Sequence, residues 1–270
     1  MKLISKIFFT FYFLLFNINP ALSVEFEGSF YQGSFILGKT ESGSKVSIDG
    51  KSIKVSNDGY FVFGLSKDRK SDVLIKIYKN KKIEVFEKKV FKRKYKIQRI
   101  DGLPEKKVTP PKEVYERIKR ENKLIGEARS IDSNLTFFKK KFIKPLDNSI
   151  VTGVYGSQRI LNGKPKWPHY GLDFAAKEGA KIKAMLDGTA TMVEKDLFYT
   201  GGTIIFDHGH GVSTLYMHMK DIFIKKGQKV KQGEIIGTVG STGRSTGPHL
   251  DVRLNWFDVR LDPASVLKED

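Results

Sequence analysis

The sequence predicts a mainly antiparallel all-β protein made of a small Ig-like β-sandwich, a helical linker and a second β-rich domain. Three observations indicate this class. Short apolar runs alternate with turn residues over residues 26–91, with no helical period between them. A proline-punctuated polar stretch follows and contains one helical pattern. Beyond Pro145 the chain is rich in glycine between further apolar runs, which is typical of tight hairpins in a compact antiparallel sheet.

A chain of 270 residues is long enough for two domains that each bury their own core. We expect a signal peptide over residues 1–23, the β-sandwich over 24–103, a linker with a helix over 104–144, and the second domain over 145–268. No segment after the signal peptide is apolar over the roughly 20 residues that a membrane span requires.

The first residues have the pattern of an export signal. Lys2 and Lys6 precede an uncharged run over residues 7–16, and residues 21–23 supply small side chains for cleavage. We therefore expect a mature chain that begins near Val24. Its location would be periplasmic or otherwise extracytoplasmic, without a stable membrane span after cleavage. A permanent membrane anchor is the alternative.

The composition is strongly basic and lacks cysteine. The formal net charge is +18, mostly from lysine, and a field of this sign attracts polyanions. Behind an export signal these would be cell-wall polymers or anionic lipid headgroups, and we expect no nucleic-acid partner. A lysine-rich composition without any polyanionic partner explains the charge equally well. Without cysteine the chain forms no disulfide, so any metal site must use His, Asp and Glu.

Turn signals separate the strands that are predicted in the N-terminal half. Asp49-Gly50 and Asn57-Asp58-Gly59 are typical of tight turns between antiparallel strands. We expect strands over residues 45–48, 52–55, 60–63, 73–78 and 83–90. This half contains no histidine, which argues against a metal site there.

The linker begins with a stretch that Pro104, Pro110 and Pro111 punctuate. Residues 112–131 follow and are rich in charged helix formers, with apolar residues on a rough helical stripe. The stripe residues are Val114, Ile118, Ile125 and Ala128. We therefore expect one helix near residues 111–131, between the two β domains.

The C-terminal half holds every histidine of the chain: His169, His208, His210, His218 and His249. Strands are expected over residues 203–206 and 212–217. His208 and His210 lie in a glycine-containing stretch between these two strands. We interpret both as turn residues outside any metal site.

The other three histidines have spacings that suit metal binding. In a strand of period two, His169 and Asp173 project from the same face. The same alternation places His249 beside Asp251, and His218 on a third strand would add another imidazole. Zinc accepts imidazole and carboxylate ligands and keeps one position open for water in catalytic sites. On spacing alone, a surface pair joined by a hydrogen bond is also an admissible interpretation.

Five ordered segments give residues 149–263 a resemblance to peptidase family M23, the lysostaphin and LytM-type zinc metalloendopeptidases that cut peptidoglycan peptides. These segments are His169-Tyr170-Gly171-Leu172-Asp173-Phe174-Ala175-Ala176, Asp187-Gly188-Thr189, Asp207-His208-Gly209, Tyr216-Met217-His218-Met219, and Ser241-Thr242-Gly243-Arg244-Ser245-Thr246-Gly247-Pro248-His249-Leu250-Asp251. Five segments in order are far more specific than any one of them. The resemblance implies an exported protein in which a β-sandwich precedes an M23-type β-sheet peptidase domain.

The resemblance assigns roles to individual residues. It implies that His169, Asp173 and Asp251 bind one Zn²⁺ per catalytic domain. It also implies that His218 and His249 are catalytic, as base and as stabilisers of the tetrahedral intermediate. The activity it implies is hydrolysis of peptidoglycan stem peptides or cross-links through a metal-activated water.

Asp251 departs from the family pattern, which has histidine as the third metal ligand. Aspartate binds zinc, but two carboxylates cancel the formal charge of Zn²⁺ and weaken it as a Lewis acid. Reduced activity, a different metal preference and a degenerate site are all admissible. The alternative function is therefore a weak or inactive M23-like regulator of other cell-wall hydrolases, with hydrolase or divisome proteins as partners.

A third hypothesis rests on residues 224–234, which look like half of a lipoyl-type hairpin of carrier domains and efflux adaptors. That similarity reflects a shared hairpin and explains none of the histidines. The peptidase hypothesis explains them, so we prefer it.

Overall fold

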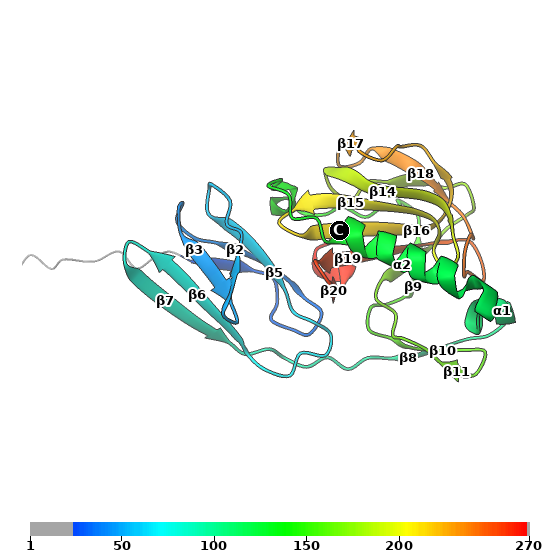
Figure 1. Ribbon diagram of the computed structural model, residues 1–270, viewed down its shortest axis with the longest axis horizontal. Coiled ribbons are helices and arrows are strands. Elements are labelled where there is room, and N and C mark those ends of the chain that lie inside the picture. Colours follow the sequence, from blue (N-terminus) through cyan, green and yellow to red (C-terminus); the bar gives the residue numbers. More distant parts are fainter. Residues whose placement is uncertain (1–23, 269–270) are drawn as a thin grey trace, which may run out of the picture.

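The computed structural model describes residues 24–268, and it confirms a mainly antiparallel β architecture. The expected signal peptide, residues 1–23, lies outside the described residues. Figure 1 shows an N-terminal β domain and a larger C-terminal β domain, joined by a long connection that contains the helices. Among the described residues, no helix is long and apolar enough to cross a membrane.

Two small antiparallel sheets form the N-terminal domain, with the strand orders β1-β2-β5 and β4-β3-β6-β7. The strands are β1 (Glu25–Glu27), β2 (Phe35–Lys39), β3 (Lys45–Ile48), β4 (Lys51–Ile53), β5 (Tyr60–Gly64), β6 (Val73–Lys79) and β7 (Lys82–Lys88). Alternation along β6 directs Val73, Ile75 and Ile77 into the core, where Phe61 and Phe63 from the other sheet are also fully buried. The sequence pattern predicts β3 to β7 and misses β1 and β2.

The connection between the domains holds a strand and two helices. Its elements are β8 (Ile97–Ile100), α1 (Glu105–Val108), a 3-10 turn (Lys112–Val114) and α2 (Tyr115–Arg129). The predicted helix is present, but it begins only at Tyr115, after the turn that follows the two adjacent prolines. Its apolar stripe packs on the C-terminal domain, where Ala128 joins a buried cluster with Ile205 and Leu215.

Strand β8 crosses over to the C-terminal domain. It pairs in parallel with β10 (Gln158–Leu161), which in turn pairs with β11 (Lys164–Pro165). The sequence pattern predicts no strand here, because the segment is short and polar at its centre and its partner is distant along the chain. A strand from the predicted β-sandwich segment thus lies against the second domain.

A ten-stranded sheet forms the body of the C-terminal domain. Its main path runs β17-β14-β15-β16-β19-β12-β9, and the other three strands pair beside this path. The strands are β9 (Ile150–Gly153), β12 (Leu172–Ala175), β13 (Lys181–Lys183), β14 (Gly188–Leu197), β15 (Gly201–Gly209), β16 (Val212–Ile222), β17 (Lys229–Val230), β18 (Ile235–Val239), β19 (His249–Trp256) and β20 (Val259–Leu261). The two strands predicted for this region lie within β15 and β16. Short 3-10 turns over Phe137–Lys139 and Pro263–Ser265 complete the described chain.

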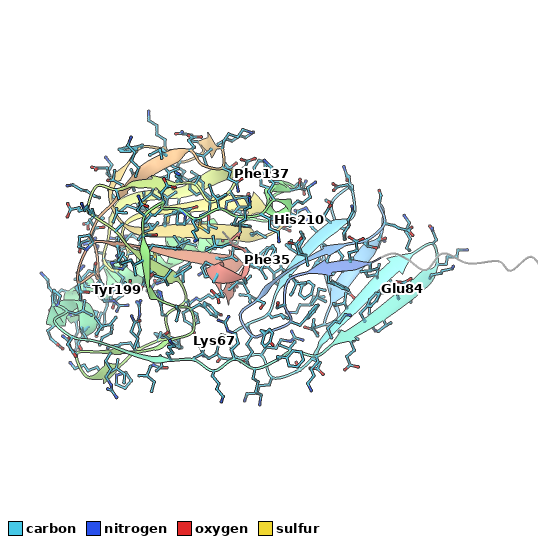
Figure 2. All side chains as sticks on the ribbon, turned by 180° about the vertical axis from the view of Figure 1, so that it is seen from behind. Phe35, Lys67, Glu84, Phe137, Tyr199 and His210 are labelled. Atoms are coloured by element: carbon cyan, nitrogen blue, oxygen red, sulfur yellow. The ribbon has the colours of Figure 1, made fainter. Side chains whose placement is uncertain are left out.

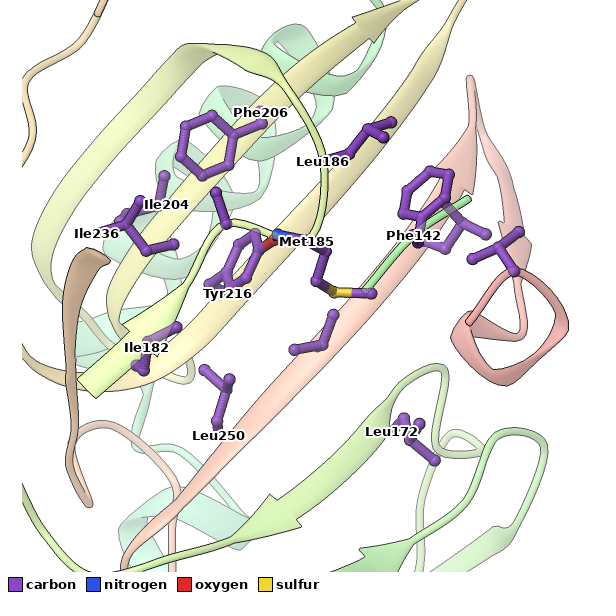
Figure 3. Packing of buried hydrophobic residues seen from close by; sticks show 14 of the residues in the cluster. Phe142, Leu172, Ile182, Met185, Leu186, Ile204, Phe206, Tyr216, Ile236 and Leu250 are labelled. Atoms are coloured by element: carbon purple, nitrogen blue, oxygen red, sulfur yellow. The ribbon is translucent and has the colours of Figure 1, made fainter. Parts of the chain in front are cut away.

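The largest apolar cluster packs against this sheet, as Figure 3 shows in part. The rings of Phe206 and Tyr216 meet edge to face with centroids 5.6 Å apart. The buried Tyr216 hydroxyl accepts a hydrogen bond of 2.7 Å from the backbone amide of Met185, so neither polar group is left unpaired. Phe35 and Val62 of the N-terminal domain belong to the same cluster. The two domains therefore share a packed contact.

Candidate metal centre

Two aspartates face one another across neighbouring strands. Strands β12 and β19 are antiparallel, and Asp173 lies directly opposite Asp251 in their register. Side chains at opposite positions project from the same face of a sheet, so the two carboxylates converge. Gly153 and Gly171 leave room for them, because a Cβ at either glycine would lie 2.1 Å from a carboxylate oxygen.

His169 joins the two aspartates from a loop. It precedes β12, so the prediction that His169 and Asp173 share a strand face is wrong. The loop is fixed by two backbone hydrogen bonds: His169 N donates to Ser157 O at 2.8 Å, and Gly156 N donates to His169 O at 2.7 Å. The buried ring places Nε2 3.0 Å from Asp173 Oδ1 and Nδ1 3.9 Å from Asp251 Oδ2. The fold of the loop, and not strand alternation, brings the three side chains together.

This cluster leaves buried polar atoms without hydrogen-bond partners. Both ring nitrogens of His169 and Oδ1 of Asp173 have none among the described residues. A buried polar atom left unsatisfied costs about 1–3 kcal/mol, so three in one place need a compensating ligand. One ligand atom from each of His169, Asp173 and Asp251 lies within 4.8 Å of the others. An imidazole nitrogen with two carboxylate oxygens is a set that zinc accepts, so these residues fit a divalent cation.

Two arginines flank the aspartates. Arg159 Nη2 lies 2.7 Å from Asp173 Oδ2, and Arg253 Nη2 lies 3.1 Å from Asp251 Oδ2. Burial raises the pKa of Asp251, but Arg253 and His169 outweigh it and hold this pKa below its ordinary value. Burial and Asp251 likewise raise the pKa of Asp173, whereas His169 and Arg159 lower it and prevail. Both aspartates are therefore ionised at neutral pH, and the two guanidinium groups balance their charge.

The sequence pattern gives no role to these arginines. Arg253 lies two residues after Asp251 in β19, so strand alternation could have placed the two side chains on one face. Arg159 comes from β10, outside the ten-stranded sheet. No local signal in the sequence connects it with Asp173.

His218 and His249 lie side by side, with ring centroids 4.7 Å apart. His218 Nδ1 lies 2.8 Å from Thr242 O, and His249 Nδ1 lies 2.9 Å from Gly247 O. A carbonyl oxygen only accepts hydrogen bonds, so each Nδ1 carries a proton and each Nε2 faces away from this contact. Both rings line the same cleft as Asp173. The structure thus brings together all five residues that the sequence singles out.

The backbone holds His218 in an uncommon conformation. Its φ of 63° lies in the left-handed region, and its amide donates to Thr200 O at 2.8 Å. Such a conformation costs about 1–3 kcal/mol and persists only where the surrounding structure fixes it, often at functional sites. Burial, with a smaller contribution from His249, lowers the pKa of His218 to about 4. His218 is therefore neutral at pH 7, the form that accepts a proton.

A cleft of about 300 Å³ opens beside the cluster. Residues 244–249 line it together with Asp173 and His218. Gln98 and Ile100 of β8 line it as well, although the sequence pattern assigns no role to this strand. The connection between the two domains is therefore part of the cleft.

The remaining two histidines lie away from the cluster. The prediction that His208 is a turn residue is wrong, because it lies in β15 and is fully buried. His210 does lie in the turn that follows, with a φ of 50°. Figure 2 shows His210 near the N-terminal domain, at the opposite end of the C-terminal domain from Tyr199. Neither histidine belongs to the group around His169.

The burial of His208 predicts a pH-dependent stability. Its ring nitrogens contact Asp187 O at 2.7 Å and Thr214 Oγ1 at 2.8 Å, and burial lowers its pKa from 6.5 to about 4. Between these values the unfolded chain binds a proton that the folded chain does not, so the free energy of unfolding falls as the pH drops from 6.5 towards 4. We expect His208 to account for roughly 3 kcal/mol of the loss between pH 7 and pH 4.

Urea unfolding of the parent and of His208→Gln, both in EDTA, measures this contribution, since glutamine is polar but does not titrate. The parent should lose more stability than the variant over this pH range. An equal loss in the two proteins would mean that His208 titrates normally in the folded state.

Comparison with known proteins relates the C-terminal half to one family. Residues 167–263 match the model of Peptidase family M23. Over 101 residues the chain is 41% identical to the peptidoglycan DD-endopeptidase ShyA of Vibrio cholerae, a match that covers 37% of this chain and 23% of ShyA. Over 98 residues it is 43% identical to the DD-carboxypeptidase/endopeptidase Mpg of Neisseria meningitidis, covering 36% of this chain and 22% of Mpg. The chain therefore matches less than a quarter of the length of either relative.

A crystal structure from Pseudomonas aeruginosa, assigned to peptidase M23, shares the architecture over most of the chain. Its TM-score is 0.68 at 26% sequence identity, and the match covers 88% of this chain and 95% of that one. The similarity thus extends beyond the C-terminal sheet to the connection and the N-terminal domain. Taken with the family match, it shows that residues 167–263 form a Peptidase family M23 domain.

Proposed function

We propose that this chain is an exported zinc metalloendopeptidase that hydrolyses peptide bonds of peptidoglycan. The observation that carries the proposal is the buried cluster of His169, Asp173 and Asp251, with its unsatisfied ligand atoms, beside a cleft that His218 and His249 line. The name of ShyA, a peptidoglycan DD-endopeptidase, supports the substrate. An extracytoplasmic location agrees with this substrate and with the export-signal pattern of residues 1–23.

Zinc suits the cluster because catalytic zinc sites use three protein ligands and keep a fourth position open. His169, Asp173 and Asp251 would supply the three ligands. Asp173 also lines the cleft, so the cluster is accessible from it. When bound, the ion polarises the scissile carbonyl and lowers the pKa of a water molecule.

The ion pairs that the two aspartates form with arginines offset the negative charge that Asp251 adds to the metal site. By themselves, the two aspartates would cancel the charge of a divalent cation. Arg159 and Arg253 return two positive charges at 2.7 and 3.1 Å from the carboxylate oxygens. The two aspartates and the two arginines have no net charge together. The positive charge of the cation is therefore not cancelled, and it can polarise the substrate carbonyl. Asp251 is therefore compatible with an active site and is not by itself a sign of degeneration.

The two histidines handle the protons of the reaction. Each holds its Nδ1 proton on a backbone carbonyl, which leaves Nε2 as the reacting atom. Neutral His218 takes a proton from the attacking water and passes it to the leaving amine. His249 presents its Nε2 to the same space and would stabilise the oxyanion of the tetrahedral intermediate through a hydrogen bond.

Digestion of purified peptidoglycan by zinc-loaded protein, residues 24–270, tests this function. We expect soluble muropeptides with new peptide ends, identified by mass spectrometry, which also show whether a stem peptide or a cross-link is cut. EDTA should abolish the digestion and added zinc should restore it. Zinc-loaded protein that leaves peptidoglycan intact would contradict the proposal and favour a regulator of other cell-wall hydrolases.

A further inference from the structure

A third arginine, Arg244, lines the cleft, and the part of the chain that the structure describes offers it no acidic partner. Arg159 and Arg253 each contact an aspartate of the metal cluster. Among residues 24–268, no carboxylate lies within ion-pair distance of Arg244, whose side chain nevertheless lines the cleft and is partly buried. Removing a cation from water without pairing it is unfavourable, so this arrangement calls for an anion from outside the chain.

Arg244 is held in place instead of being free to turn towards solvent. Its guanidinium lies 4.5 Å from the centroid of the Tyr199 ring, and its Nη1 lies 3.5 Å from Lys107 O. The backbone of Arg244 is bound to the same tyrosine, since Arg244 N donates a hydrogen bond to Tyr199 O at 2.8 Å. Gly243 permits this approach, because a Cβ there would lie 2.5 Å from Tyr199 O. The side chain is thus fixed before a ligand arrives, which lowers the entropy cost of binding.

The composition of the cleft favours a negatively charged ligand. Asp173 is the one acidic residue among those that line it, and Arg159 already pairs with that carboxylate. The other lining residues are neutral or apolar, apart from the histidines and the two arginines. A positively charged peptide group beside Arg244 would be repelled, whereas a carboxylate would meet a rigid guanidinium fork.

Arg244 is also close to the reacting groups. The next residue, Ser245, places its Oγ 3.1 Å from His249 Nδ1. The same loop therefore carries Arg244 and supports the ring that would stabilise the oxyanion. An anion bound by Arg244 would lie near the bond that is cleaved.

We propose that Arg244 binds a carboxylate of the peptide substrate close to the scissile bond, so that the cleft selects acidic cross-link peptides over neutral ones. This inference rests on the proposed peptidase function and adds the substrate class to it. Arg244 is then a specificity-determining residue, which contributes mainly to substrate binding and not to the chemical step.

Two synthetic cross-linked peptide dimers, in which a non-hydrolysable isostere replaces the scissile peptide bond, test the proposal. They differ only in the group next to the cleaved bond, which is a free carboxylate in one and a primary amide in the other. Calorimetry on the zinc-loaded protein should show the carboxylate peptide binding about 10–100-fold more tightly, as expected for a hydrogen-bonded ion pair. Arg244→Gln should abolish this preference and leave the affinity for the amide unchanged, whereas Arg244→Lys should keep part of it.

Arg120→Gln is the matched control, because it removes the same charge from an exposed position on α2. It should keep the full preference for the carboxylate peptide. Equal affinities of the parent for the two peptides, or a preference that persists in Arg244→Gln, would overturn the proposal. The parent comparison decides even if Arg244→Gln does not fold. Because binding is measured without turnover, a carboxylate preference in a protein that leaves peptidoglycan undigested would refute the peptidase function alone.

Discussion

Replacing Asp251 with alanine is expected to release zinc from the protein. The cluster loses one of its three ligands, and Arg253 loses the carboxylate that it contacts at 3.1 Å, which leaves a guanidinium beside the cation. Both changes disfavour a cation. We expect the zinc affinity to fall by more than about 100-fold, beyond the roughly 10–100-fold that is typical when a group supporting a ligand is lost. Equilibrium dialysis against zinc buffers, followed by metal analysis, measures the affinity.

Asp258→Ala is the matched control for this variant. Asp258 is an almost fully exposed aspartate between β19 and β20, and it contacts Arg129 and none of the three residues of the cluster. Its loss should leave zinc binding and peptidase activity unchanged, whereas Asp251→Ala should lose both together. An unchanged zinc affinity in Asp251→Ala would remove Asp251 from the ligand set.

The second large effect is expected for His218→Ala, which should keep zinc while losing activity. His218 lies outside the group of His169, Asp173 and Asp251, so its removal does not take away a ligand. It does take away the Nε2 that accepts and returns the proton, which typically costs about 10² to 10⁴ in rate. Peptidoglycan digestion rates, compared at equal zinc content, measure this loss.

His210→Ala controls for the removal of a histidine from the same domain, because His210 lies in a turn and does not line the cleft. It should digest peptidoglycan at close to the parent rate. Equal losses of zinc and activity in His218→Ala would instead place His218 among the metal ligands.

Strands with strong local signals could be predicted from the sequence, and strands defined by distant contacts could not. In β6, alternating apolar residues between turns predict the strand almost to its ends. In β2, the pattern is broken by Gly38, whose missing side chain makes room for the ring of Phe61 from β5. The contact between Gly38 and the Phe61 ring forms only in the folded chain, so the sequence pattern cannot show it. Strand β8 is similar, since its pairing with β10 gives it its structure.

The residues of the candidate site also fall into those that local spacing predicts and those that only distant contacts bring together. The residues with chemically distinctive side chains at short spacings, such as His249 and Asp251, could be singled out because strand alternation is local. The contribution of Arg159 could not, since its contact with Asp173 forms only in the folded chain. The same holds for Arg244, whose lack of an acidic partner among residues 24–268 is visible only when the cleft is assembled.

The proposed peptidase function requires that His169, Asp173 and Asp251 together hold a zinc ion. Anomalous diffraction at the zinc edge from crystals of the zinc-loaded protein tests it directly. We predict one peak per chain, about 2.0–2.2 Å from a nitrogen of His169 and from an oxygen of each aspartate. No peak at this position, with zinc absent or bound elsewhere in the protein, would contradict the account.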